Sequence, residues 1–206
     1  MKKLLFLSAL FIFGFASCSK DDSIIDRGVV IDGVRWATRN VDAPGTFAAT
    51  PQCTGMLFQW NRRTGWNTTD EVVDGFDSSI PEGAAWYAAN NPCPRGWRVP
   101  TAEELRSLAN AKRERTVQNG VPGFLFGTAP NQIFLPSAGA RRSDGLLQDV
   151  NRMGSYWGSG TYWGSNHASW LRWWACRFFE TEVQTFVFLP ACSSKTHARS
   201  VRCVAK

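Results

Sequence analysis

The chain has 206 residues, of which 44% are apolar and only 19% are charged, so the composition excludes a disordered, highly charged protein. The formal net charge of +6 falls to +4 (21 basic against 17 acidic residues) without the two lysines of the amino-terminal segment, too mild a balance to predict a nucleic-acid partner. Ten Trp and 18 Gly residues together indicate short strands, tight turns and a core of large aromatic rings.

The amino-terminal segment is typical of an export signal. Lys2 and Lys3 precede an apolar run over residues 4–15, which has the length of a signal-peptide core and is too short to span a bilayer. Two small residues then precede Cys18, and this arrangement resembles a bacterial lipoprotein leader, in which cleavage falls before the Cys and its thiol receives a diacylglycerol. We therefore expect residues 1–17 to be a lipoprotein signal peptide and Cys18 to carry the lipid. The alternative is an ordinary cleaved signal peptide with a Cys nearby.

Residues 18–27 have the composition of a tether. Asp21 and Asp22 resemble the acidic export signal of Bacteroidetes lipoproteins, which sends them to the outer face of the outer membrane. No other segment approaches 18 consecutive apolar residues, so the lipid is the one membrane attachment that we expect. The expected location is the outer membrane, with the protein facing the cell exterior.

A β-hairpin is the first element predicted after the tether. Residues 29–31 and 34–37 are short apolar runs, and Asp32-Gly33 between them is a strong hairpin signal. The segment 42–55 should be a loop, and 56–60 a strand.

A long surface loop is predicted over residues 61–84, which are polar and rich in turn formers, and a helical turn over 84–90. The clearest helix signal follows, because Thr101 has Glu104 three positions on, the reciprocal capping pattern. We expect a helix over residues 102–112.

The basic run over residues 112–115 is interpreted as cations near a helix carboxyl terminus rather than as a nucleic-acid site. Residues 116–160 alternate Gly- and Pro-rich turns with short apolar pieces. Strands are predicted over 169–177, 185–189 and 199–204. The predicted class is α+β.

Six short motifs follow one another in an order that points to one family: residues 33–40 (GVRWATRN), 55–62 (GMLFQWNR), 93–105 (CPRGWRVPTAEEL), 135–139 (LPSAG), 154–159 (GSYWGS) and 200–204 (SVRCV). Together they resemble the Fibrobacter succinogenes major paralogous domain, which is abundant in surface lipoproteins of gut Bacteroidetes. The resemblance covers about residues 28–205, so we expect one domain over residues 28–206.

The resemblance implies a C-type-lectin-like fold, related to the formylglycine-generating enzymes. In that fold a small antiparallel sheet joins the first and last strands, one or two helices flank it, and long loops carry the binding surface. It also implies a disulfide between Cys93 and Cys203. Cys176 and Cys192 are the second predicted pair, which leaves Cys53 free; a bridge from Cys53 to Cys192 or Cys176 is the alternative.

Four Trp residues lie inside the family motifs and are expected in the core: Trp36, Trp60, Trp97 and Trp157. Strand alternation over residues 169–177 instead places Trp170, Arg172 and Trp174 together on one face. That face is a candidate flat aromatic surface for a sugar ring or a protein partner, with Trp163 as a weaker member. The alternative is that a covering loop buries it.

Metal and cofactor motifs are absent from the sequence. There is no CxxC and no spaced His pair, and His167 and His197 are expected at the surface or in loops. The triplets with which sugar-binding C-type lectins hold calcium are also missing, so we expect neither a metal nor a cofactor.

The functional hypothesis is a non-catalytic, lipid-anchored module that binds a glycan or a surface protein. The alternatives are a fimbrial or envelope structural subunit and, ranked last, an enzyme related to the formylglycine-generating enzymes, whose characteristic Cys pair cannot be mapped onto this chain. The sequence sets no oligomeric state.

Overall fold

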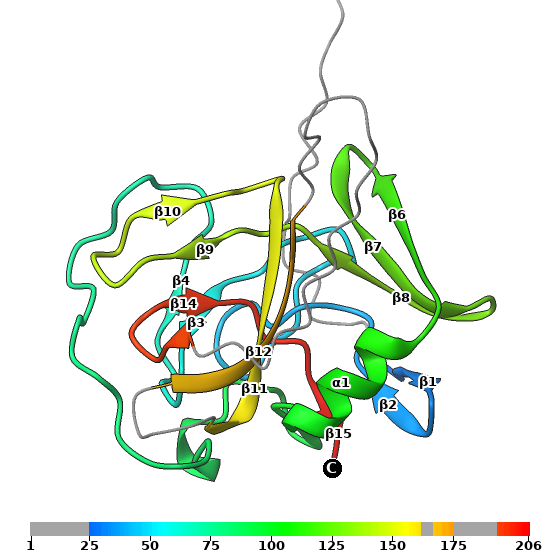
Figure 1. Ribbon diagram of the computed structural model, residues 1–206, viewed down its shortest axis with the longest axis horizontal. Coiled ribbons are helices and arrows are strands. Elements are labelled where there is room, and N and C mark those ends of the chain that lie inside the picture. Colours follow the sequence, from blue (N-terminus) through cyan, green and yellow to red (C-terminus); the bar gives the residue numbers. More distant parts are fainter. Residues whose placement is uncertain (1–24, 162–166, 175–192) are drawn as a thin grey trace, which may run out of the picture.

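The computed structural model describes residues 25–161, 167–174 and 193–206. Within these ranges the chain forms a small α+β domain that is mainly β, with one α-helix, as predicted (Figure 1). The helix is α1 (Ala102–Asn110), and a 3₁₀ turn, η1, spans Ala88–Asn90. The predictions for Cys18, Trp163, Cys176 and Cys192, and the strand predicted over 185–189, concern residues outside the described ranges.

The strands form four small sheets. The first has the order β1-β2-β15-β5, with β1 (Val29–Ile31), β2 (Val34–Trp36), β15 (Val204–Ala205) and β5 (Trp97–Arg98). The second has the order β10-β9-β14-β3-β4, with β10 (Leu147–Gln148), β9 (Ala140–Arg141), β14 (Ala198–Arg199), β3 (Leu57–Gln59) and β4 (Gly65–Trp66). The third is β11-β12-β13, with β11 (Met153–Thr161), β12 (His167–Trp174) and β13 (Ser193–Ser194). The fourth is β6-β7-β8, with β6 (Arg113–Gln118), β7 (Val121–Thr128) and β8 (Asn131–Pro136).

The opening hairpin and the closing strand share a sheet. Asp32 and Gly33 turn the hairpin with φ values of 48° and 80°, and two positive φ values are what the type I′ hairpin turn requires. Val204 in β15 then lies opposite Trp36 in β2 on one side and Arg98 in β5 on the other. The two ends of the described chain therefore meet in one sheet.

The α-helix starts at the predicted capping box. The Thr101 side chain accepts a hydrogen bond from the Glu104 amide at 3.2 Å, and the Glu104 carboxylate accepts one from the Thr101 amide at 2.7 Å. The helix ends at Asn110, two residues before the predicted end. The basic run follows it into β6, yet Arg113 donates from Nη1 to the Ala109 carbonyl at 2.7 Å, so one of its cations does cover a helix carboxyl end.

The antiparallel meander β6-β7-β8 was not predicted, because Pro122, Gly123 and Gly127 suggested turns in this segment. Pro122 stands near the start of β7, where its carbonyl still accepts the Ser137 amide at 2.8 Å. Gly123 is required by close packing, since a Cβ there would lie 2.3 Å from the Leu135 carbonyl oxygen. These residues mark tight contacts within strands rather than breaks between them.

Three apolar clusters divide the core. We define the helix half of the molecule as β1, β2, α1, β6, β7 and β8. The first cluster lies in this half and contains Ile31, Leu105, Phe126 and Leu135. At the opposite side, Trp66, Phe76 and Leu147 pack on the small cluster of Leu57, Ala138 and Ala198. Between them lies a cluster that includes Trp60, Trp157 and Cys203.

Three of the four Trp residues predicted in the core are fully buried, namely Trp36, Trp60 and Trp157. Trp97 is half-buried, with its ring at 5.6 Å from that of Phe47.

A buried polar network joins the motifs that lie far apart in the sequence. Arg202 donates from Nε and Nη2 to the Asn40 side-chain oxygen at 3.0 and 2.7 Å, and from Nη2 to the Phe134 carbonyl at 3.0 Å. Tyr156 donates to the Pro136 carbonyl at 2.8 Å and accepts from the Asn40 amide at 3.3 Å. Burial raises the pKa of Tyr156 to about 12 and lowers that of Arg202 to about 10. The network fixes the closing segment against the opening segment and β8.

Candidate functional site

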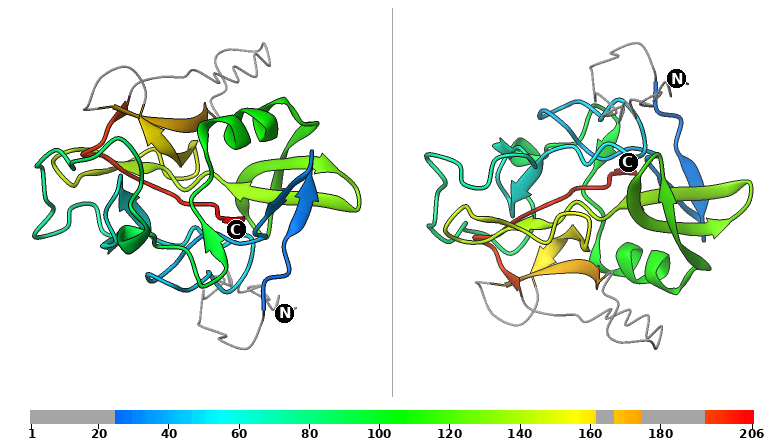
Figure 2. Two further views of the ribbon diagram at one scale, coloured as in Figure 1. Left: turned by 90° about the horizontal axis from the view of Figure 1, so that it is seen from below. Right: turned by 90° about the horizontal axis from the view of Figure 1, so that it is seen from above.

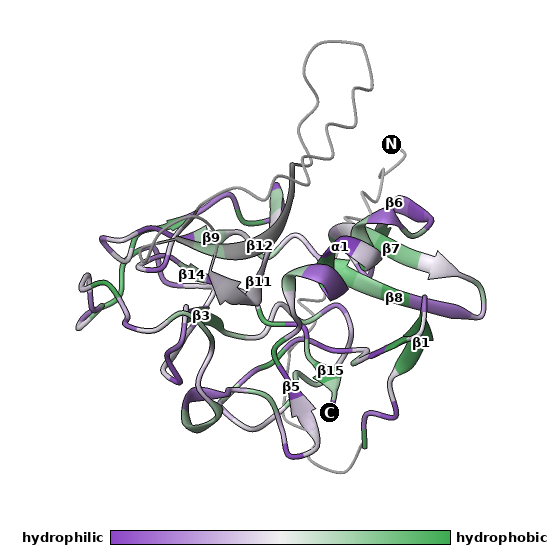
Figure 3. Cartoon of the chain, turned by 60° about the horizontal axis from the view of Figure 1, so that its bottom comes forward, coloured by the Kyte–Doolittle hydropathy of each residue, from purple (hydrophilic) through white to green (hydrophobic). Residues whose placement is uncertain are grey.

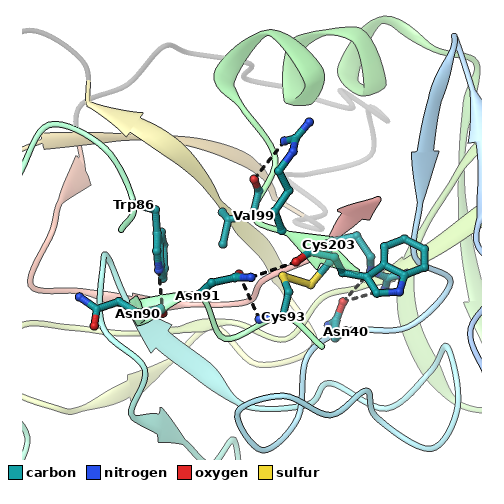
Figure 4. The surroundings of a disulfide bond; sticks show 10 residues. Asn40, Trp86, Asn90, Asn91, Cys93, Val99 and Cys203 are labelled. Carbon is teal, nitrogen blue, oxygen red and sulfur yellow. Dashed lines mark hydrogen bonds between the residues drawn. A yellow bond between two sulfur atoms is a disulfide. The ribbon is translucent and has the colours of Figure 1, made fainter. Parts of the chain in front are cut away.

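The predicted disulfide between Cys93 and Cys203 is present. The two sulfurs are 2.07 Å apart, and both residues are buried (Figure 4). The Asn91 side chain holds the turn before the bridge, because it accepts from the Cys93 amide at 3.2 Å and donates to the Trp97 carbonyl at 2.9 Å. The bridge therefore ties the segment that precedes α1 to the last strand.

Cys53 is also in a disulfide bond, so the prediction that it is free is wrong. Its partner lies outside the described residues, and the alternative pairing with Cys176 or Cys192 stays a prediction. No motif places the loop that contains Cys53, so the sequence alone left this bond as an alternative to the Cys176–Cys192 pair.

The loop platform, defined as residues 61–91, is irregular apart from the short strand β4 and the 3₁₀ turn η1. It runs along the side of the molecule farthest from β1 and β6, in teal and green at the left of Figure 1, and the view from below shows the same separation (Figure 2). The predicted surface loop over 61–84 is thus confirmed, apart from the short strand β4. Strands supply partners to some of its backbone groups, as where the Leu147 amide of β10 donates to the Glu71 carbonyl at 2.8 Å, and buried side chains supply others.

Arg141 anchors the first part of the loop platform. The side chain is fully buried, and it donates from Nη2 to the Asn67 and Asp70 carbonyls at 2.9 and 2.8 Å. Nη1 also reaches the Gly145 carbonyl at 2.7 Å. Burial lowers the pKa of Arg141, and the nearby Asp70 charge opposes this shift. One guanidinium thus donates to several backbone carbonyl groups that no neighbouring strand of the described chain pairs at these positions.

Hydrogen bonds from Gln59, the last residue of β3, and from Arg62 hold the middle of the loop platform. The Gln59 side-chain amide donates to the Asp77 carbonyl at 2.5 Å and to the Thr196 carbonyl at 2.9 Å. Arg62 pairs with the Asp77 carboxylate and donates to the Ser79 hydroxyl at 2.7 Å. These contacts fix residues 77–79 against the second sheet.

The last part of the loop platform rests on Asn61. This residue has a φ of 54°, and its side-chain oxygen accepts from the Tyr87 amide at 2.7 Å while its side-chain nitrogen donates to the Glu82 carbonyl at 3.0 Å. The Asn90 side chain donates back to the Asn61 carbonyl at 2.9 Å. The left-handed backbone at Asn61 therefore turns both ends of one amide toward the loop.

Lys195 supports the same region from below. Its ammonium is buried, lies 4.2 Å from the centroid of the Trp60 ring and donates to the Gly83 carbonyl at 2.6 Å. The Trp86 ring is 5.9 Å from that of Trp60 and donates from Nε1 to the Asn90 carbonyl at 2.9 Å. Because the ammonium is buried and hydrogen-bonded, it stabilises the loop conformation and does not contact molecules in solution.

The outer surface of the loop platform is acidic and carries exposed apolar side chains. It contains five exposed carboxylates and two arginines, a balance of 2 − 5 = −3: Asp70, Glu71, Asp74, Asp77, Glu82, Arg62 and Arg63. Val72, Ile80 and Tyr87 are 60%, 48% and 51% exposed. A surface that is held by buried side chains and mixes carboxylates with exposed apolar groups suits the binding of another molecule.

The predicted aromatic face has a described backbone only. Trp170, Arg172 and Trp174 lie in β12, where Trp170 pairs with Trp157 and Arg172 with Ser155 in β11. Their side chains, and the whole of Trp163, lie outside the described residues, so their role in binding stays a prediction. The partner strand β11 meets the loop platform further along, where the Trp86 amide donates to the Ser159 carbonyl at 2.8 Å and Ala85 bridges to Gly160.

Titratable side chains occur throughout the described part of the chain. No three residues among its His, Cys, Asp and Glu side chains gather as metal ligands. His197 lies in the loop before β14, as expected, and burial together with the Arg199 charge lowers its pKa to about 4. It is therefore neutral near pH 7. No helix in the described ranges is long and apolar enough to cross a bilayer.

The residues that build the loop platform were not found from the sequence. Arg141 and Lys195 occur in no motif, and Gln59 lies in the GMLFQWNR motif without a local sign of its partners. The role of all three depends on carbonyl groups that lie farther away in the chain. Asn61 has the one local signal, since Asn is the residue that most readily adopts a left-handed backbone after Gly.

Comparisons with known proteins returned nothing: no family model, no curated protein and no solved structure matches the chain.

Proposed function

We propose that the chain is a lipid-anchored, non-catalytic binding module of the bacterial cell surface, and that the loop platform is its ligand-binding surface. In this proposal Cys18 carries the lipid, residues 18–27 form the tether, and the domain is a C-type-lectin-like member of the Fibrobacter succinogenes major paralogous family. The ligand is a glycan or an envelope protein.

The family assignment is supported by how its motifs meet. Asn40, Tyr156 and Arg202 come from three of the six motifs and form one buried network, to which the LPSAG motif contributes the Pro136 carbonyl. A common need to complete this network explains why short motifs spread over the chain occur together.

The binding role is carried by a single observation: the loop platform is irregular and yet held by buried side chains. Arg141 and Asn61 fix carbonyl and amide groups along the loop before any ligand arrives. A surface fixed in this way loses little conformational entropy on binding, which is the advantage that preorganised sites have.

The position of the loop platform also favours presentation to the outside. The described chain begins beside β1, and the loop platform lies on the opposite side of the molecule (Figure 1). A tether that enters at β1 leaves the loop platform facing away from its anchor.

The anchor is tested by labelling cells with a fatty-acid probe. We expect the full chain to incorporate the probe and to partition with membranes, and the C18S variant to do neither. Incorporation by the C18S variant would reject the lipid site.

The binding surface is tested on glycan arrays and on extracted envelope proteins. We expect the V72S/I80S/Y87S variant to lose the binding that the unaltered protein shows. V117S is the matched control, because Val117 is equally exposed at 63% but lies on β6. A W170A/W174A variant is measured beside them. Loss confined to that variant would move the site from the loop platform to β12.

A further inference from the structure

The elements on the side of the molecule opposite the loop platform, namely β1, β2, α1 and β6, carry exposed basic and apolar side chains (Figure 1). We define the basic surface as the exposed charged residues of segments 27–36 and 102–118, which contain the β1–β2 hairpin, α1 and β6: Arg27, Asp32, Arg35, Glu103, Arg106, Lys112, Arg113, Glu114 and Arg115. Six are basic and three acidic, so the balance is 6 − 3 = +3, against −3 for the loop platform. The polar residues of β6 stand out in purple in Figure 3.

Exposed apolar side chains divide between the same two surfaces. Of the six large ones in the described chain, three lie on the loop platform. The other three lie beside the basic surface: Ile25 is 84% exposed, Val30 41% and Val117 63%. Cations interspersed with exposed apolar groups are the pattern of surfaces that bind anionic bilayers.

The basic surface is continuous with the entry of the tether. β1 packs on the same apolar cluster as α1, β7 and β8, since Ile31, Leu105, Phe126 and Leu135 belong to it. The described chain starts at Ile25, and Arg35 of β2 donates to the Arg27 carbonyl at 3.2 Å, so the chain enters beside the hairpin part of the basic surface. The seven residues from Cys18 to Ile25 span at most about 25 Å when fully extended. A lipid on Cys18 therefore keeps the basic surface close to the headgroups.

We propose that the basic surface binds anionic lipid headgroups and so orients the domain with the loop platform away from the membrane. The placement of the tether rests on the proposed lipid anchor, but the charge and exposure of the surface do not. The acidic loop platform is repelled by the same headgroups, so attraction at one side and repulsion at the other favour one orientation.

The test uses the mature chain from Cys18 to Lys206 with C18S, so that no lipid contributes. Co-sedimentation is measured with phosphatidylcholine vesicles that contain or lack phosphatidylglycerol. We expect binding to the anionic vesicles alone, weakened by added salt. K112E/R115E should lower the partition coefficient by about tenfold or more.

The matched control is R63E/R142E, which makes the same change in net charge on the side of the loop platform, where both side chains are exposed. We expect this variant to bind as well as the parent. Circular dichroism checks that both double variants fold. V117S is a second test variant that changes no charge, and we expect it to bind anionic vesicles more weakly because it removes an exposed apolar side chain.

Three outcomes would overturn the proposal. The first is equal binding to neutral and anionic vesicles, and the second is an equal loss of vesicle binding in the two double variants. The third is a salt-sensitive dimer in place of vesicle binding, because the basic surface would then bind the acidic loop platform of a second copy. Because the chain tested has no lipid, failure here is distinguishable from failure of the Cys18 anchor.

Discussion

The helix half and the loop platform satisfy their backbone hydrogen bonds in different ways. In the helix half, β6, β7 and β8 pair residue by residue, and α1 begins at its own capping box. In the loop platform, carbonyl groups are bonded by side chains such as Arg141 and Lys195, which come from other parts of the chain. Regular structure distributes its stability over many equal bonds, whereas the loop platform concentrates it in a few buried groups.

The largest expected effect comes from the disulfide, which serves both regions. Replacing Cys93 and Cys203 by Ser opens a bridge with a sequence separation of 110, and should lower the free energy of unfolding by about 4 to 5 kcal/mol. Urea denaturation measures the loss, and hydrogen exchange should show faster exchange in both regions. Faster exchange in one region alone would contradict a bridge that is shared by both.

Arg141 separates the two regions most sharply. Arg141→Met leaves the Asn67, Asp70 and Gly145 carbonyls without their donor, so we expect a loss of about 2 to 4 kcal/mol with faster exchange in the loop platform and little change in β7.

The control for this variant is Arg142→Met, which removes an exposed ion pair with Asp144 and should cost less than about 0.5 kcal/mol. Equal losses in the two variants would show that the loop platform does not depend on a single buried cation.

His197 should make the platform side sensitive to acid. Its folded pKa is about 4, below the ordinary value of 6.5, so the unfolded chain binds the proton more readily. Its contribution to stability is complete above pH 6.5 and declines as the pH falls toward 4, by about 1 to 2 kcal/mol after allowance for its partial exposure.

The measurement is the difference between the unfolding free energies of the parent and of His197→Gln, from pH 7 to pH 4.5. The facing groups Arg199, Arg142 and Asp144 are the same in both proteins. Parallel pH curves would assign the acid sensitivity to other groups.

The smallest effect is expected at the capping box of the helix half. Thr101→Ala removes one side-chain acceptor and should cost about 1 kcal/mol by urea denaturation, with Ser107→Ala in the middle of α1 as the control. Bonds from Arg98 and Thr101 outweigh burial and hold the pKa of Glu104 below its ordinary value. A loss as large as that of Arg141→Met would remove the contrast between the two regions.

Local signals account for the parts of the fold that were predicted. The Asp32-Gly33 hairpin, the start of α1 at Thr101 and the surface loop each depend on residues within a few positions of one another. The meander was missed because Pro122 and Gly123 serve contacts with strands that the local pattern does not specify.

The sequence by itself determined the class, the helix start, the opening hairpin and, through a resemblance, the bridge between Cys93 and Cys203. The tertiary structure alone decided which side chains hold the loop platform and how charge divides between its acidic side and the basic surface. The physical reason is distance along the chain. A cap or a turn is completed by near neighbours, whereas the acceptors of Arg141 in the loop platform are about 70 residues away, at positions that only the folded backbone brings to it.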